Sequence, residues 1–399
     1  MTTSSKETTP VIVSATRTPV GVYLGGLSSL KAPVLGGIAI REAVKRAGVE
    51  VDDVEEVIMG IVLQGGVGQS PARQAAMAGG IPASKPSLTV NKVCGSGLKS
   101  VMLAAQAIKA GDAQCIVAGG MESMSNAPHY VYGMRGGIKY GDQKLVDGLQ
   151  LDGLWCAFHD NVMGVHADYT AEKAGVTREQ QDEFACNSQQ KTVAAMEAGK
   201  FDAEIVPVEV PGRKGKVTVV DKDEGPRPGT TVEALAKLRP VFTKDGTVTA
   251  GNASTINDGA GAVVVTSEAF AEKHGLEVLA RVTGYATGHV EPKELFFAPI
   301  VAVENLMKKL DVSIDHFDLI EANEAFASQS LANGNALGWD WDRVNVNGGA
   351  IAIGHPIGAS GARVFTTLLY AMKDRDAKTG LATLCLGGGG AVALSVERV

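Results

Sequence analysis

The stretch CGSGLK at residues 94–99 has a counterpart in GASGAR at residues 358–363. Each follows a predicted strand and precedes a predicted helix, and in both halves the next predicted strand runs into glycines. The order and spacing of these elements agree, although few residues are identical. Because the separation is too long for a solenoid, we interpret the repeat as the duplication of one α/β domain.

Outside these two stretches, predicted strands continue to alternate with predicted helices. Such alternation, with apolar strands, is typical of an α/β fold whose sheet is largely buried. The predicted strands are residues 11–13, 54–62, 88–93, 115–118, 260–266, 278–284, 317–322, 344–346 and 381–386. The predicted helices are residues 35–47, 72–78, 98–109, 267–274, 300–310 and 362–372.

The alternation breaks down between residues 121 and 249, which are rich in loops. Within this stretch, residues 177–180 match a capping box that predicts the start of a long helix, and residues 211–216 predict a hairpin turn. We therefore interpret the stretch as an insertion. The predicted parts are an N-terminal half (1–120 plus 250–275), an inserted loop domain (121–249) and a C-terminal half (276–399).

Composition excludes several classes of function. The chain has 399 residues, of which 45% are apolar and 20% charged, so it can bury a sizeable core. Its net charge of −7 disfavours nucleic acid or an anionic membrane as the main partner. No apolar run approaches the roughly 18 residues of a membrane-spanning helix. Residues 1–10 are polar and lack the apolar core of a signal peptide, so a cytoplasmic location is expected.

The cysteines are scattered, at positions 94, 115, 156, 186 and 385. Their odd number and the lack of a CxxC motif argue against a disulfide framework and favour a reducing compartment. No set of Cys and His has the spacing of metal ligands, so no metal site is predicted. Cys115, Cys156 and Cys186 are interpreted as structural, and His159 and His166 as surface residues beside a loop.

Four chemically capable side chains fall at strand ends or in turns: Cys94, Asn323, His355 and Cys385. Ligands and catalytic groups collect at such positions in α/β sheets. Cys94 directly precedes a helix, whose dipole is expected to lower the pKa of the thiol and make it a nucleophile. The flanking Gly95 and Gly97 would let a substrate approach. The alternative is a buried structural cysteine.

His355 lies between glycines and would accept the Cys94 proton, then donate to a developing oxyanion. Asn323 would be an orienting or oxyanion group, with Glu324 as the alternative orienter and a capped strand end as the structural alternative. Cys385 would be a second acid or base, unless it is an inert thiol beside a tight turn. The glycines that follow it offer N–H donors for an oxyanion.

Two thiols and one imidazole suit covalent acyl transfer followed by proton removal from a second substrate. A Cys/His protease would need no second thiol. The sequence has no Walker A loop and no complete GxGxxG fingerprint between a strand and a helix, so nucleotide hydrolysis and NAD chemistry are weak hypotheses.

Four blocks carry a family resemblance: NKVCGSG (91–97), NEAF (323–326), GHP (354–356) and CLGGG (385–389). Together with GGMESMS (119–125), TAGNAS (249–254) and NDGA (257–260), they resemble the signature blocks of the thiolases across essentially the whole chain. The resemblance implies a duplicated five-layer α-β-α-β-α fold with a loop domain over the active site. It also implies ping-pong acyl transfer on coenzyme A thioesters, with no permanently bound cofactor.

The resemblance also implies roles for individual residues. Cys94 would carry the acyl group with His355 as its base, and Cys385 would exchange a proton with the α-carbon of acetyl-CoA. The N–H groups of Cys94 and Gly387 would form one oxyanion hole. His355 and a water held by Asn323 would form the other.

Further residues would bind coenzyme A by similarity. Ser254 would contact the pantetheine arm, in a tunnel lined by apolar side chains, and two residues would lie near the adenine nucleotide. The tunnel residues are Leu154, Met163 and Phe326, the residues near adenine are Phe242 and Arg227, and Ala250 would add a further contact.

The expected partners are acetyl-CoA, acetoacetyl-CoA or another 3-ketoacyl-CoA, and copies of the chain itself in a homotetramer (a dimer of dimers) built through residues 121–141. Acetoacetyl-specific thiolases usually show a histidine where this chain has Val162, so broader or longer-chain specificity is the alternative. A decarboxylating condensing enzyme, which generally has a histidine in place of Cys385, is a second alternative. A non-catalytic acyl-CoA-binding protein is a third, but it should lack one of the four reactive groups.

Overall fold

The computed structural model describes residues 5–399. Residues 1–4, part of the polar stretch for which no signal peptide is expected, lie outside the described residues. The strands are β1 (Pro10–Arg17), β2 (Gly21–Val22), β3 (Glu56–Gly60), β4 (Ser87–Val90), β5 (Cys115–Ser123), β6 (His129–Tyr130), β7 (Val146–Asp147), β8 (Trp155–Cys156), β9 (Asn161–Val162), β10 (Val208–Pro211), β11 (Val217–Val220), β12 (Asn257–Ser267), β13 (Ala280–His289), β14 (Leu319–Ala322), β15 (Thr379–Leu386) and β16 (Gly390–Glu397).

The α-helices occur in both halves of the chain and in part of the inserted region. They are α1 (Ala32–Ala47), α2 (Pro71–Ala78), α3 (Ser96–Ala110), α4 (Met163–Ala174), α5 (Arg178–Glu197), α6 (Val232–Leu235), α7 (Glu268–His274), α8 (Ala298–Leu310), α9 (Ala327–Leu337), α10 (Ala350–Ile353) and α11 (Ser360–Asp374). The predicted capping box is confirmed, because Thr177 and Gln180 exchange hydrogen bonds at the start of α5. Ser267 is the N-cap of α7, because its hydroxyl accepts a hydrogen bond from the backbone N–H of Phe270.

The strand order confirms the duplication. The large sheet runs β14-β15-β16-β13-β1-β12-β5-β3-β4. In the N-terminal half, β1, β12 and β5 pair antiparallel and β5 pairs parallel with β3; in the C-terminal half, β13, β16, β15 and β14 repeat this pattern. Within residues 5–399, strand pairing between the two halves of the sheet is limited to two residue pairs, Val11 with Arg281 and Ile12 with Ala280.

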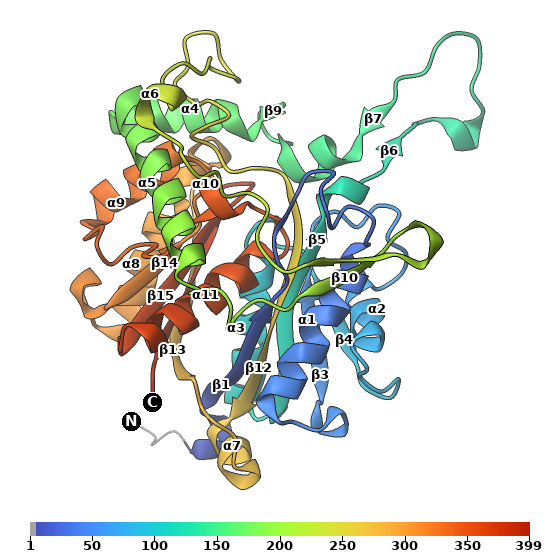
Figure 1. The fold of residues 1–399 in the computed structure, drawn as a ribbon, viewed down its shortest axis with the longest axis vertical. Helices are drawn as coiled ribbons and strands as arrows, with labels where there is room; N and C mark the ends of the chain where they lie inside the picture. The colour runs from blue at the N-terminus through green and yellow to red at the C-terminus, as the bar shows by residue number, and fades with distance from the viewer. Residues whose placement is uncertain (1–4) are drawn as a thin grey trace.

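Side-chain direction along the strands confirms the predicted five layers. Val264 packs with α1 and α2 on the outside of the N-terminal half, whereas its neighbour Val263 packs with α3 and α11. Leu381 packs with α8 outside the C-terminal half, and its neighbour Ala382 faces α3 and α11. Since successive strand residues face opposite sides, α3 and α11 form a central layer between two sheet halves, with α1 and α2 on one outer face and α8 on the other (Figure 1).

The central helices approach each other closely at two glycines. A Cβ atom on Gly361 would lie 2.1 Å from the backbone nitrogen of Leu98, and a Cβ on Gly97 would lie 2.8 Å from that of Ala362. Each of these two glycines is the fourth residue of its stretch, CGSG at residues 94–97 and GASG at residues 358–361. The motif that indicates duplication is therefore also the contact point between the two halves.

The prediction of a strand at residues 344–346 is wrong. Only an isolated bridge joins Val344 to Ile320, and Asn345 adopts a left-handed conformation with φ of 45°. The Asn345 amide instead pairs with the backbone of Ala322, at 2.8 Å in each direction. A side chain thus replaces the ladder that β4 makes in the N-terminal half.

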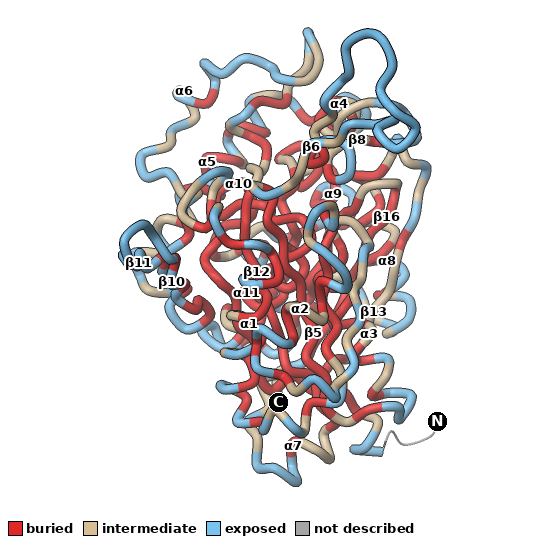
Figure 2. The backbone as a smooth tube through the Cα atoms, turned by 90° about the vertical axis from the view of Figure 1, so that its right-hand side faces the viewer, coloured by how far each residue is buried: buried red, intermediate tan, exposed pale blue. Residues whose placement is uncertain are grey.

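The inserted region contributes no strand to the large sheet between residues 124 and 256. β5 continues to Ser123, two residues past the predicted start of the loop. The predicted hairpin is confirmed as β10 and β11, and β6 and β7 carry a second projection from the top of the molecule (Figure 1). Figure 2 shows that the segment between β6 and β7 and the turn between β10 and β11 are exposed while the large sheet is buried. Among the described residues, no helix combines the length and apolar character needed to cross a membrane.

Replacement of Gly361 by alanine tests the central contact. Helix propensity alone predicts that Gly→Ala within a helix stabilises by roughly 0.5–1 kcal/mol. The clash with the Leu98 backbone predicts the opposite, a loss of about 3 kcal/mol or more in the free energy of unfolding. Urea denaturation would measure the difference. Gly136→Ala is the matched control, because a Cβ there meets nothing within 4 Å. A stabilised Gly361→Ala variant would contradict the packing argument.

Candidate active site

One apolar cavity of about 410 Å³ brings together most of the residues predicted to act on a substrate. It opens below the inserted region, at the ends of the strands and turns that carry Cys94, His355, Cys385 and Gly387. The predicted substrate-binding residues in its wall are Leu154, Met163, Phe242, Ser254 and Phe326.

Arg227 and Ala250 do not line this cavity. They border a neighbouring depression of about 310 Å³, and both residues are exposed. Thr255 lies in the wall of both hollows, so the two are adjacent. An apolar cavity next to an exposed depression bordered by Arg227 suits a ligand with an apolar arm at one end and a polar group at the other.

The backbone before α3 is bent sharply to present Cys94. Val93 has φ of 47°, an unfavourable conformation for a β-branched residue. Asn91 Oδ1 accepts from Val93 N at 3.0 Å, and Ser96 Oγ donates to Val93 O at 2.6 Å. Strain held by surrounding hydrogen bonds is typical of functional turns.

The two flanking glycines have a packing role that was not predicted. A Cβ on Gly95 would lie 2.7 Å from a methyl group of Leu386, and Gly97 contacts α11 as described above. They allow the Cys94 turn to sit directly against β15 and α11.

The prediction that the helix dipole lowers the pKa of Cys94 is wrong for this structure. Burial raises the pKa of the Cys94 thiol to about 12. The N–H of Gly387 donates to the sulfur and opposes this shift, but loss of hydration in the apolar cavity dominates. Cys94 is therefore a neutral thiol until a base takes its proton.

His355 is held as a neutral base. Its Nδ1 lies 2.6 Å from Ser360 Oγ, and that hydroxyl donates its own hydrogen to Pro356 O at 2.9 Å. Nδ1 must then carry the hydrogen donated to Ser360, which leaves a lone pair on Nε2. Burial, with a smaller effect of the Arg363 charge, lowers the pKa of His355 to about 3. Ser360 was not among the predicted site residues, although it lies in the repeated GASG stretch.

Asn323 lies beside His355, as its position after β14 predicts. Its Nδ2 is 3.4 Å from both ring nitrogens of His355. Its buried Oδ1 has no hydrogen-bonding partner within the described residues, so this oxygen can hold a water or a ligand donor. The alternative orienter, Glu324, is engaged elsewhere, since its carboxylate accepts from Ser188 and Asn345.

Cys385 is buried near the end of β15, with 2% of its surface exposed. Burial raises its pKa, and the nearby Cys94 adds to the shift. The turn that follows is built by Gly388 and Gly389, whose φ angles of 82° and 87° favour glycine. Two neutral thiols thus share one cavity with one neutral imidazole.

Glu122 was not predicted as a site residue, but it holds two segments of the site together. Its buried carboxylate accepts from the backbone of Val62, Leu63 and Gly358 at 3.0, 3.2 and 2.9 Å. Burial raises its pKa to about 7 despite these donors. It joins the loop after β3 to the turn that carries His355. An acidic residue within the apolar run of β5 was the available signal.

One of the two histidines expected on the surface is buried. His159 is exposed, but only 2% of His166 is accessible. His166 lies within α4, on the buried side of that helix.

Comparisons with known proteins agree with the division into two halves. Residues 10–269 match the family model described as thiolase, N-terminal domain, and residues 276–398 match thiolase, C-terminal domain. The chain therefore belongs to the thiolase family.

Individual relatives align over nearly the full length. A Pseudomonas aeruginosa protein named acetyl-CoA acetyltransferase is 57% identical, covering 97% of this chain and 99% of its own. An Escherichia coli protein of the same name is 54% identical over 98% and 99%. The crystal structure of the Bacillus anthracis acetyl-CoA acetyltransferase superposes with a TM-score of 0.96 at 41% identity, covering 98% of this chain and 99% of that one.

The protonation state of Cys94 predicts its reactivity with iodoacetamide. Below a pKa of about 12, the thiolate fraction increases about tenfold per pH unit, so the alkylation rate of Cys94 should rise that steeply from pH 7 to 10. Peptide mass spectrometry would follow Cys94 apart from the other cysteines, with Cys94→Ser as the blank. A plateau below pH 8 would instead indicate a preformed thiolate–imidazolium pair.

Proposed function

We propose that this protein is an acyltransferase that reversibly condenses two molecules of acetyl-CoA into acetoacetyl-CoA and CoA. The observation that carries the proposal is the apolar cavity in which two neutral thiols, Cys94 and Cys385, face one neutral imidazole, His355. Membership of the thiolase family and the names of its relatives support the choice of acetyl-CoA.

The first half-reaction would transfer an acetyl group to Cys94. His355 Nε2 accepts the Cys94 proton as the sulfur attacks the thioester carbonyl, and the resulting imidazolium balances the charge that develops. The CoA thiolate leaves with a proton donated by Cys385. Burial keeps both thiols protonated at rest. The Cys94 thiol therefore gives its proton to His355, and the Cys385 thiol gives its proton to the leaving CoA, only when a substrate is bound.

The second half-reaction would form the carbon–carbon bond. The Cys385 thiolate takes a proton from the α-carbon of a second acetyl-CoA, and the carbanion attacks the acetyl group on Cys94. Cys94 leaves as a thiolate and recovers its proton from His355. The proton and acyl transfers therefore balance among these groups and two CoA thioesters, and the cycle needs no other bound cofactor for its chemistry.

Two sets of donors would stabilise the oxyanions. The N–H of Gly387 already points at the Cys94 sulfur, so it is well placed, with the N–H of Cys94, for the acyl oxygen. His355 and a water on the free Oδ1 of Asn323 would meet the enolate oxygen of the second substrate.

Coenzyme A would extend from this cavity to the adjacent depression. The pantetheine arm would pass Ser254 and the apolar wall near Phe326. The Phe326 ring packs edge to face on that of Phe242, with 6.2 Å between the two ring centroids. The nucleotide would lie toward Arg227 and Ala250. In this arrangement residues 121–249 act as the loop domain that covers the active site.

A specific observation favours a second candidate, a thiolase of broader chain length. Val162 lines the cavity as an apolar, partly buried side chain where a histidine is usual in acetoacetyl-specific thiolases. A longer acyl chain would meet no polar group at that point of the wall.

We also infer a cytoplasmic homotetramer. The segment between β6 and β7 carries several exposed apolar side chains: Val131, Tyr132, Met134, Ile138, Tyr140 and Leu145. Contiguous exposed apolar surface is typical of an association site, and light scattering on a variant with residues 132–140 replaced by a short glycine-serine linker would test it.

Acetyl trapping would test the proposed reaction. After exposure to acetyl-CoA, the wild type and Cys385→Ser should carry an acetyl group on Cys94, and Cys94→Ser should not. Thiolysis of acetoacetyl-CoA should fall at least about 100-fold in both variants, because each loses a nucleophile or an acid–base group. Cys115→Ser is the control, because Cys115 lines neither hollow and begins β5 at the opposite end of that strand from Glu122.

The same assay with 3-ketoacyl-CoAs of increasing length would separate the two candidate specificities. A kcat/KM highest for acetoacetyl-CoA supports the first, and one that rises with chain length supports the second. Full activity in either thiol variant would overturn the assigned roles, and the absence of any acetyl-enzyme would favour a binding protein without catalysis.

Two variants at one position would test the oxyanion role of Gly387. Gly387→Pro removes the N–H and should lower kcat by about 10²–10³-fold, the usual effect of losing an oxyanion donor. Gly387→Ala keeps the N–H, and its Cβ would meet only Val93 methyl groups, the nearest at 3.3 Å, so it should retain most activity. Equal activity in a folded proline variant would contradict the assignment.

A further inference from the structure

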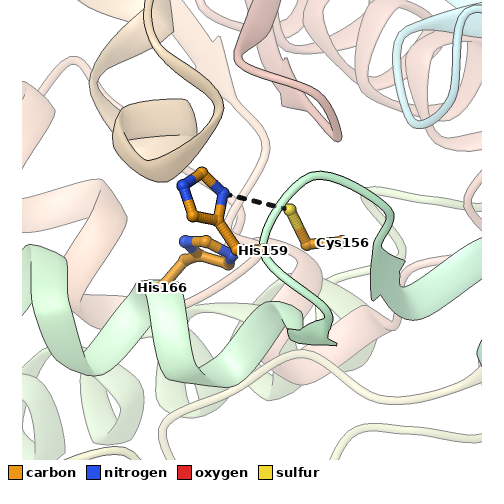
Figure 3. A group of neighbouring side chains, drawn as sticks. All are labelled: Cys156, His159 and His166. Carbon is orange, nitrogen blue, oxygen red and sulfur yellow. Dashed lines mark hydrogen bonds between the residues drawn. The ribbon is translucent and has the colours of Figure 1, made fainter.

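Three metal-binding side chains converge beside the cavity, on a part of the chain that the proposed reaction does not use. They are Cys156, His159 and His166, and one ligand atom from each lies within 4.8 Å of the others. Figure 3 shows the Cys156 sulfur pointing at the His159 ring, with the His166 ring beside that of His159. No other such group of Cys, His, Asp or Glu occurs within residues 5–399.

The three residues come from two adjoining elements. Cys156 ends β8, and His159 lies in the turn that joins β8 to β9. His166 is one turn into α4, which begins directly after β9. The turn is held by a hydrogen bond of 3.0 Å from the Trp155 indole to Asp160, whose φ of 51° allows the chain to reverse. The β8–β9 turn and the start of α4 therefore carry all three ligands, and a contact with the distant Lys293 orients His166.

The distance between Cys156 and His159 matches one edge of a tetrahedral metal site. Cys156 Sγ lies 3.7 Å from His159 Nδ1. With zinc–sulfur and zinc–nitrogen bonds of about 2.3 and 2.0–2.1 Å, the sulfur–nitrogen edge of a tetrahedron is roughly 3.6 Å. The two imidazole rings lie 5.5 Å apart at 75°, so their nitrogens can point to one centre without stacking.

His166 has the orientation expected of a ligand. Its Nδ1 lies 3.3 Å from the carbonyl oxygen of Lys293, so Nδ1 carries the hydrogen and donates it. Nε2 then keeps a lone pair, yet this atom is buried and has no hydrogen-bonding partner within the described part of the chain. Metal-bound histidines typically donate their second nitrogen to a carbonyl or carboxylate in this way.

If the three side chains only stabilised the fold, the free-energy cost of burying an unpaired nitrogen on His166 would be unexplained. A Cys–His hydrogen bond would account for Cys156 and His159. It would not account for an unpaired acceptor on His166, since buried polar atoms are normally satisfied. A metal ion satisfies all three groups together.

We propose that Cys156, His159 and His166 bind a divalent transition-metal ion, with zinc as the best match, and that water completes the coordination. One thiolate and two imidazoles form a donor set suited to zinc and unsuited to magnesium or calcium. On binding, the Cys156 thiol releases its proton to solvent and the sulfur forms the metal bond. The ion would fasten the β8–β9 turn to α4, between the cavity-lining Leu154 and Met163.

Titration of the full-length protein with CoCl₂ and ZnCl₂ would test this site. The experiment uses a Cys94→Ser/Cys385→Ser background, so that the two cavity thiols cannot supply ligands. After treatment with EDTA and dialysis, Co²⁺ should give a thiolate charge-transfer band and tetrahedral visible bands that saturate at one ion per chain. Zn²⁺ should bleach them, and elemental analysis should give the same stoichiometry.

Single replacements distinguish a specific metal site from nonspecific metal binding. Cys156→Ser should abolish the charge-transfer band, and His159→Asn should weaken binding by more than the roughly 10–100-fold seen when only an outer partner of a metal ligand is lost. His159 is exposed, so this variant retains the fold even if Cys156→Ser does not. Cys186→Ser and His129→Asn are matched controls away from the cluster.

Local protection gives an independent readout. Zn²⁺ should slow backbone hydrogen exchange in residues 155–166 of the background protein and leave that segment of His159→Asn unchanged. Binding below one ion per chain, or equal binding by His159→Asn and the His129→Asn control, would overturn the proposal.

Discussion

The close approach of α3 and α11 is the constraint on which the active site depends. Gly97 and Gly361 bring the two backbones to a distance that no Cβ atom permits. Because Cys94 and His355 lie in the turns just before these helices, the same contact sets the two groups at one cavity. Helix packing and catalytic geometry are thus parts of a single interaction across the duplicated halves.

Burial sets the chemistry of that cavity. It raises the pKa values of Cys94 and Cys385 and lowers that of His355, so three reactive groups are neutral in the resting protein. Neutral groups cost less to bury than charged ones, and proton transfer among them requires a substrate to stabilise the charge. Ser360 and Glu122 hold the turn around His355 in the geometry that this transfer needs.

Several sequence-based predictions failed for the same physical reason, namely that neighbours distant in sequence change the environment of a residue. The dipole of α3 favours a Cys94 thiolate, but the apolar wall supplied by other elements outweighs it. Residues 344–346 are apolar enough for a strand, yet the Asn345 side chain takes the place of the ladder. His166 resembled a surface residue because its burial depends on the packing of α4 against the segment that contains Lys293.

The sequence by itself determined the duplicated α/β architecture, the capping box of α5, the hairpin of β10 and β11 and the family. These follow from local patterns, whose period, caps and motifs can be read within a short window. Only the tertiary structure decided the protonation states of the buried groups, the packing role of Gly97 and the convergence of Cys156, His159 and His166. Each of these depends on distances and lost hydration between segments, and a one-dimensional pattern contains neither quantity.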